Sequence, residues 1–171
     1  MPTPLGWQQP YSGYQWFGPG VHVSPSGSPS PPLGGTSCAP MAGNGAGVLV
    51  CLDQNARNPS LRNVDGSLVW DFPNANENYS YFTFSPAGDR LAYFKFGQAT
   101  AARGDVLTLH GDVVAHLPDA FRPRAWLDGS TLLGEDMQGG RQLAYVQLSD
   151  QPTMHDLGPL PGFAVVGALP S

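Results

Sequence analysis

The chain has 171 residues, which is long enough for a domain with a hydrophobic core. Its 22 glycines and 18 prolines, with only 12% charged residues, are typical of a turn-rich β protein. The formal net charge is −5, and a single lysine, Lys95, accompanies seven scattered arginines. Nucleic-acid binding requires cations clustered on one surface, so nucleic acid is not expected as a partner.

The N-terminal part of the chain differs in composition from the rest. Residues 1–52 contain no Asp, Glu, Lys or Arg, and nine prolines lie among the first 40 residues. Proline lacks an N–H donor and therefore disfavours helices and central strands. We predict that residues 1–46 form a Pro/Gly/Ser-rich, largely disordered leader and that residues 47–171 fold. Aromatic residues of the leader, such as Trp7 and Trp16, either pack back onto the body, belong to an upstream strand fragment (Tyr14–Val23), or form an adhesive tail that docks a partner.

The two cysteines, Cys38 and Cys51, are too few for a metal framework. One interpretation is a disulfide bond that ties the leader to the first strand of the folded part. The other is a pair of unpaired thiols, with Cys51 buried in a strand. Both alternatives stay open at the level of the sequence.

From Gly47 onward the chain consists of short apolar runs bounded by Gly, Pro, Asn or Asp, without a sustained 3.6-residue period. This pattern predicts an all-β fold. Several runs, such as residues 90–96, are apolar on both alternating faces, which predicts strands buried on both sides. The predicted strands are Val48–Leu52, Ser60–Val64, Leu68–Phe72, Ser80–Phe84, Arg90–Phe96, Val106–His110, Val113–Leu117, Pro123–Trp126, Thr131–Gly134, Gln142–Leu148, Thr153–Leu157 and Phe163–Leu169.

A repeat of about 40 residues runs through this part of the chain. Gly88 and Gly129 lie 41 residues apart, each between an apolar strand end and a strongly apolar strand. Four short strands in each repeat predict β-propeller blades, because one blade cannot bury both of its faces alone. A second series of turns recurs later in each unit, at Asp65-Gly66, Gly111-Asp112 and Ser149-Asp150.

Residues 84–93, which contain the first of these glycine turns, read FSPAGDRLAY. This segment is similar to the FSPDGxxLAY core of the WD40-like repeats found in TolB-type and peptidase-associated propellers. It departs from that pattern at Ala87, where the family usually has Asp. Residues 126–133 keep an Asp128-Gly129 pair but replace the Ser-Pro. The resemblance covers residues 47–171 and implies a β-propeller without implying a ligand.

Residues 47–171 hold about three repeats, whereas closed propellers have at least four blades. We therefore expect a partial β-propeller of about three four-stranded antiparallel blades. Three ways of completing the ring stay open. The chain is a piece of a longer propeller, further copies form a homo-oligomer that closes the ring, or the leader supplies the missing strands.

No catalytic, cofactor or metal site is predicted, and the chain is not expected to be an enzyme. A Gly-x-Ser-x-Gly nucleophile elbow is absent, and the four histidines fall on separate elements. The adjacent pair Glu135-Asp136 is interpreted as a solvated turn, because neighbours on a strand point to opposite faces. No apolar run is long enough for a membrane-spanning helix.

These observations favour a non-catalytic protein- or peptide-binding or scaffolding module. Loops at one end of the blades would present Arg122, Arg124 and Trp126 to the partner. Two alternatives stay open: an accessory propeller that gates a hydrolase of the prolyl-oligopeptidase type, and a structural or adhesive protein that acts through its aromatic leader. No signal peptide is visible, so the chain is cytoplasmic as written, or exported if a targeting segment is missing.

Overall fold

All the regular structure of the described residues is β-strand. No helix in these segments is long and apolar enough to cross a membrane. The computed structural model describes residues 22–23, 29–30, 39–53, 58–73, 78–96, 102–138 and 141–159. The strands are β1 (His22–Val23), β2 (Pro29–Ser30), β3 (Ala39–Gly43), β4 (Val48–Leu52), β5 (Pro59–Asn63), β6 (Leu68–Asp71), β7 (Asn78–Phe84), β8 (Arg90–Phe96), β9 (Arg103–Thr108), β10 (Val113–His116), β11 (Phe121–Trp126), β12 (Thr131–Asp136), β13 (Gln142–Gln147) and β14 (Thr153–Pro159).

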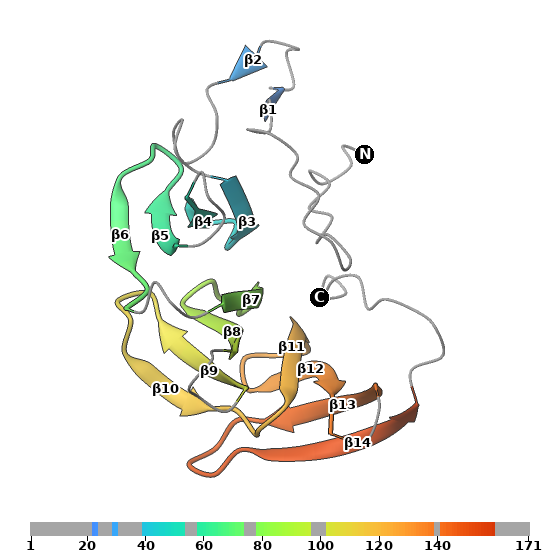
Figure 1. The fold of residues 1–171 in the computed structure, drawn as a ribbon. Coiled ribbons are helices and arrows are strands. Elements are labelled where there is room, and N and C mark those ends of the chain that lie inside the picture. The colour runs from blue at the N-terminus through green and yellow to red at the C-terminus, as the bar shows by residue number, and fades with distance from the viewer. Residues whose placement is uncertain are drawn as a thin grey trace.

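Twelve of these strands form three four-stranded antiparallel sheets, in which each strand pairs with its neighbours in the sequence. The first sheet contains β3 to β6, the second β7 to β10 and the third β11 to β14. Figure 1 shows the three sheets side by side in an open arc, with β3, β7 and β11 on its inner side. The predicted partial β-propeller of three four-stranded blades is therefore confirmed. β1 and β2 form a separate two-stranded pair.

The first blade begins earlier than the sequence pattern indicates. Ala39–Gly43 forms β3 and pairs with β4, although it lies within the segment predicted as the leader. Pro40 is compatible with this position, because β3 is an edge strand and a missing N–H is tolerated there. Asn44 shapes the turn to β4, since its Oδ1 accepts the N–H groups of Ala46 and Val48, both at 2.9 Å.

The remaining strands follow the prediction closely, and the exceptions have physical reasons. Two predicted strands coincide with the observed β4 and β8. β9 begins at Arg103 instead of at Val106. Gly104 and Asp105 have low strand propensity, but the contacts that the buried Asp105 side chain makes outweigh it. The predicted strand Phe163–Leu169 lies outside the described residues.

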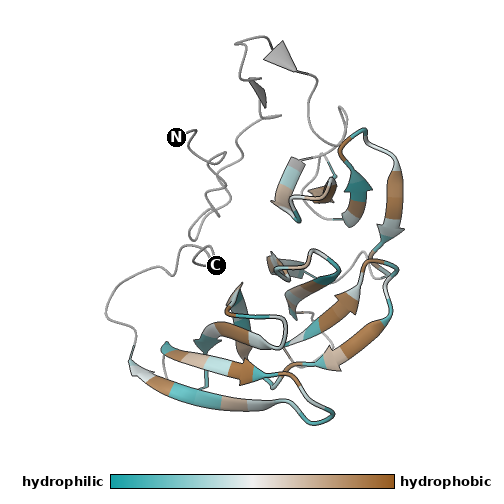
Figure 2. Cartoon of the chain, turned by 180° about the vertical axis from the view of Figure 1, so that it is seen from behind, coloured by the Kyte–Doolittle hydropathy of each residue, from teal (hydrophilic) through white to brown (hydrophobic). Residues whose placement is uncertain are grey.

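The hydrophobic core of the described residues has two large clusters, each between a pair of neighbouring sheets, and a small third one formed by Leu49 and Cys51. The side chains of β8 show how one strand serves both clusters: Leu91 and Tyr93 pack toward the first sheet, and Ala92 packs toward the third. Burial on both faces of this strand is thus confirmed, and Figure 2 shows the apolar residues running along the strands. A chain with these contacts must pack blade against blade, because an isolated sheet would leave both of its apolar faces exposed.

Polar and steric contacts also hold neighbouring blades together. The indole Nε1 of Trp126 donates a hydrogen bond to the Thr83 carbonyl at 3.1 Å, which links the third sheet to the second. Gly111 in the β9–β10 turn has a φ of +90° and packs directly against the Trp70 ring. A Cβ at this position would collide with Trp70, so the turn requires glycine for both conformation and space.

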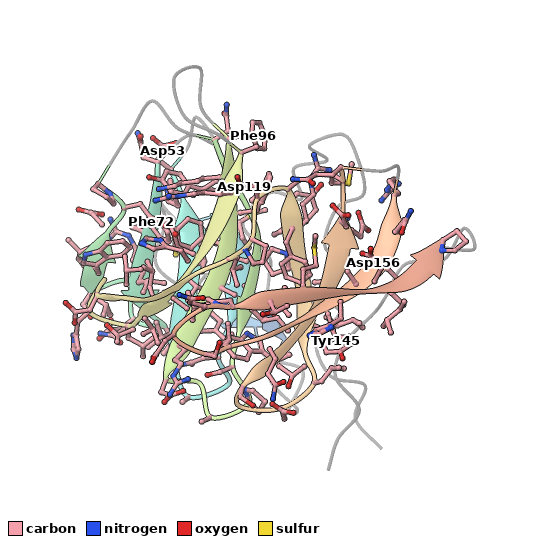
Figure 3. The ribbon with its side chains drawn as sticks, turned by 90° about the horizontal axis from the view of Figure 1, so that it is seen from below. Asp53, Phe72, Phe96, Asp119, Tyr145 and Asp156 are labelled. Atoms are coloured by element: carbon pink, nitrogen blue, oxygen red, sulfur yellow. The ribbon has the colours of Figure 1, made fainter. Side chains whose placement is uncertain are left out.

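The connections lie at two ends of the blades, which we call the turn end and the loop end. At the turn end, tight turns join the first strand of each sheet to the second and the third to the fourth. Asp65 and Asp128 each accept hydrogen bonds from a serine two residues later, and these hydrogen bonds lower the pKa of both carboxyl groups. Figure 3 shows Asp53, Phe96 and Asp119 at the opposite, loop end.

Candidate binding site at the inner strands

The candidate site lies where the inner strand of the third sheet, β11, packs against the inner strand of the second, β7. A β-bulge between Pro123 and Ala125 breaks the regular register of β11. Pro123 is buried opposite Gly134, and a Cβ on that glycine would collide with the Arg122 carbonyl and the Phe121 ring. This close approach fixes the β11 backbone against its neighbour β12 in the third sheet.

Arg124 is held from two sides. Its guanidinium lies 4.2 Å from the centre of the Tyr81 ring on β7, in a cation–π contact. Its Nη2 and Nε lie 2.9 and 3.1 Å from Oε1 of Glu135 on β12. Arg141 reaches the same carboxylate, with Nη2 at 3.2 Å from both oxygens. Two guanidinium groups therefore share one buried carboxylate.

Arg122 has a different environment, although it lies opposite Glu135 in the strand register. Its guanidinium carbon lies 5.4 Å from the Tyr81 ring centre and 5.3 Å from that of Phe94. Its Nη1 donates one long hydrogen bond of 3.4 Å to the Tyr81 hydroxyl, and its buried Nε has no acceptor. Among the described residues, Arg122 forms no ion pair.

Tyr81 owes its position to an irregularity in β7. The register of β7 against β8 shifts between Ser80 and Thr83, and Tyr81 within this bulge has a φ of +59°. A positive φ is costly for a residue with a Cβ and usually marks a constrained site. The bulge directs the Tyr81 ring toward the two arginines of β11.

The three predicted partner-binding residues lie on strand β11 and not, as predicted, in loops at one end of the blades. Arg122 and Arg124 lie together and are half-buried, whereas Trp126 is only 2% exposed and serves as a link between sheets. The interpretation of Glu135-Asp136 as a solvated turn is wrong, because both residues belong to β12 and are buried. Sequence reasoning also missed Tyr81, whose role depends on a bulge that leaves no mark in the apolar pattern.

The predicted cysteine bridge falls partly outside the described residues. Cys51 on β4 is buried and disulfide-bonded. Cys38 is the only other cysteine of the sequence, but it lies outside the described residues, so the pairing of the two stays a prediction.

A second charged cluster surrounds Asp105 on β9, which is 2% exposed. Its Oδ1 lies 2.6 Å from Nδ1 of His116, and its Oδ2 accepts a hydrogen bond of 3.0 Å from the Tyr93 hydroxyl. Lys95 Nζ lies 3.3 Å from Oδ2, and Arg103 Nε lies 4.0 Å from Oδ1. Burial alone would raise the pKa of Asp105, but the hydrogen bond with His116, the charge of Lys95 and the Tyr93 hydrogen bond together lower it.

The Asp105 cluster has the composition of a structural network. It joins neighbouring strands of one sheet, since Asp105 pairs directly with His116 on β10 and with Tyr93 on β8. The contacts among the described residues place no hydroxyl or thiol nucleophile against His116. The arrangement therefore links β8, β9 and β10 within the second blade.

Metal binding finds no support in the part of the chain that the structure describes, where no three His, Cys, Asp or Glu side chains converge. The inner strands instead bring the Arg122 guanidinium against two aromatic rings, with no ion pair among the described residues. No protein-family model matches this chain, and no curated protein matches it either.

Proposed function

We propose that this chain is a non-catalytic binding module whose inner strands, β7 and β11, hold a protein or peptide partner. The observation that carries the proposal is the Arg122 guanidinium, which lies against two aromatic rings and forms no ion pair among the described residues. Arginine and tyrosine are the residue types enriched at the energetic centres of protein interfaces.

The sheet topology supports an extended peptide as the partner. β3, β7 and β11 each lie at one edge of a sheet, on the inner side of the arc in Figure 1. Edge strands present backbone N–H and C=O groups that an extended segment can pair with, while side-chain contacts give specificity. Arg122 and Tyr81 lie on two of these strands and are placed to supply such contacts.

The assignment of the blades to the WD40-like, TolB-type repeat is part of the same proposal. Its support is the chemistry of the β7–β8 turn within FSPAGDRLAY. Ser85 Oγ accepts the N–H of Arg90 at 3.1 Å and donates to Asp89 Oδ1 at 2.8 Å. Gly88 has a φ of +72°, a conformation that glycine adopts without strain. Serine and glycine therefore have physical roles in this turn.

The test is a selection from a synthetic library of random peptides of about ten residues, long enough to span an edge strand. Half of the library carries a free C-terminal carboxylate and half is amidated, and retained peptides are identified by mass spectrometry. Dissociation constants of the retained peptides are then measured for the full chain, for Arg122→Gln and for Arg90→Gln. Arg90 is a matched control, because it is a half-exposed arginine at the turn end.

We expect retained peptides to bind Arg122→Gln at least about tenfold more weakly than the unaltered chain, because a charge-assisted hydrogen bond contributes about 1.5 to 3 kcal/mol. Arg90→Gln should leave affinity unchanged. Circular dichroism checks that both variants keep the β fold. If no peptide is retained, or if both variants bind as the unaltered chain does, the proposed function is wrong.

A further inference from the structure

We infer that the partner group read by this site is a carboxylate, in the form of an acidic side chain or a C-terminus of an extended peptide, bound by the Arg122 guanidinium. The inference rests on the proposed function and adds the chemistry of recognition. It follows from the charge balance of the cluster, from the donors that Arg122 leaves unused, and from the aromatic rings against which it lies.

The charge balance around Glu135 leaves an excess of positive charge. Arg124 and Arg141 both bind this one carboxylate and occupy both of its oxygens. Glu135 is buried, so its oxygens are shielded from further partners by the two arginines that hold them. Arg122 lies opposite in the register and is not neutralised by it. A half-buried cation without a partner gains more from an added anion than a solvated cation does.

Arg122 also keeps unused hydrogen-bond donors in a suitable place. A guanidinium has five N–H donors, and the described residues accept one of them, through the long bond to Tyr81. Nε is enclosed by protein, whereas the Nη2 group has no acceptor among the described residues and is not enclosed in this way. The Nη1–Nη2 edge therefore offers the fork that a carboxylate accepts with both oxygens.

The two aromatic rings make this fork rigid. Tyr81 and Phe94 lie at 5.4 and 5.3 Å from the guanidinium carbon, and both residues belong to the second sheet. A planar cation held against rings loses less conformational entropy when it binds a planar anion than a free arginine would. The Tyr81 hydroxyl, which now accepts from Arg122, can donate its own proton to an anion beside it.

A peptide carboxylate fits the site better than a nucleic-acid backbone does. The chain carries a net charge of −5, and the arginines of the cluster surround Glu135 instead of forming a basic stripe. A polyanion needs several aligned cations, whereas a single carboxylate needs one fork. The inner edges of the sheets also suit an extended peptide chain.

The experiment uses the peptides retained in the selection described above. The peptide that binds most tightly is synthesised in three further forms: with each Asp and Glu replaced by Asn and Gln, with the opposite C-terminal group, and with both changes. The dissociation constant of each peptide form is measured for the full chain and for the variants Arg122→Gln, Arg122→Lys and Arg90→Gln. Together these measurements give a double-mutant cycle between Arg122 and the carboxylate of the peptide.

We expect removal of the carboxylate to weaken binding at least about tenfold in the unaltered chain and in Arg90→Gln, and less than about twofold in Arg122→Gln. Arg122→Lys should recover part of the preference, because it keeps the charge but not the fork. Loss on side-chain replacement identifies an acidic residue as the source, and loss on amidation identifies a C-terminus.

Two results would overturn the inference. The first is a peptide that needs Arg122 but binds equally well with and without its carboxylates, which would leave the proposed function standing. The second is a preference for acidic peptides that persists in Arg122→Gln. In that case a residue other than Arg122 would bind the carboxylate. Failure of every peptide to bind would instead overturn the proposed function itself.

Discussion

The two buried carboxylates of this chain, Asp105 and Glu135, show how similar residues serve different purposes in neighbouring blades. Asp105 receives a tyrosine hydroxyl, a histidine and a lysine within one sheet, so its charge and its lone pairs are satisfied. Glu135 is shared by two arginines, and a third arginine nearby has no carboxylate among the described residues. The first cluster satisfies its buried carboxylate, whereas the second leaves the Arg122 guanidinium without an ion pair among the described residues.

We relate this difference to two separate properties: the Asp105 cluster to the stability of the fold, and Arg122 to the proposed binding. A buried carboxylate with several partners fixes the strands that supply them, and its removal leaves desolvated partners behind. A half-buried cation without an ion pair stabilises the fold less and gains more from an added anion. The comparison predicts that Asp105 matters most to folding and Arg122 most to recognition, with Glu135 between them.

The largest expected effect on stability is that of Asp105→Asn. This change removes the buried charge that Lys95, His116 and Tyr93 contact, and we expect the free energy of unfolding to fall by about 3 kcal/mol. Urea unfolding followed by circular dichroism measures it. Asp119→Asn is the matched control, because Asp119 is exposed and its change should stay within about 0.5 kcal/mol. A loss for Asp105→Asn as small as this would show that the Asp105 cluster does not stabilise the fold.

The same cluster predicts how stability depends on pH. The pKa of Asp105 is lowered in the folded chain, so its contribution is fully present above the unfolded value of about 3.9 and is lost as the pH falls through the folded value. The advantage of the unaltered chain over Asp105→Asn should therefore shrink below about pH 4. Urea unfolding of both proteins at neutral and acidic pH checks this. A constant advantage would show that the carboxylate charge is not what matters.

Glu135→Gln is expected to have a smaller effect, a loss of about 1 to 2 kcal/mol in the free energy of unfolding. Arg141 is more than half exposed and can turn to solvent, and Arg124 keeps its contact with Tyr81. Thermal and urea unfolding measure the change. A loss equal to that of Asp105→Asn would abolish the distinction between the two clusters.

The smallest effect on stability is predicted for Arg122, the residue that we propose binds the partner. Arg122→Gln removes cation–π contacts but also removes a half-buried charge without an ion pair, so the free energy of unfolding should change by less than about 1 kcal/mol. Urea unfolding under the same conditions tests this. A loss above about 2 kcal/mol would show that Arg122 supports the fold and would weaken the case for it as a recognition group.

Local patterns in the sequence are sufficient for the architecture of this chain. Strand positions follow from short apolar runs, and the blade repeat follows from the spacing of Gly88 and Gly129. These features are local, because turn chemistry and side-chain alternation act within a few residues. The strand β3 escaped prediction since Pro40 and the absence of charge resemble a linker, and its pairing with β4 depends on a partner strand.

The candidate site is predictable only in part. Arg122 and Arg124 stand out in the sequence as cations near a strand, but nothing local distinguishes them from each other. Their difference arises from the β11 bulge, from Tyr81 at positive φ on another sheet, and from Glu135, which the sequence pattern assigned to a solvated turn.

The sequence by itself therefore determined the all-β class, the blade repeat and most strand positions, because these depend on neighbours along the chain. The tertiary structure alone decided which charges are paired. Ion pairing and burial depend on groups brought together from separate strands and sheets, so Asp105 is satisfied while Arg122 is not. That distinction separates a structural cluster from a candidate binding site.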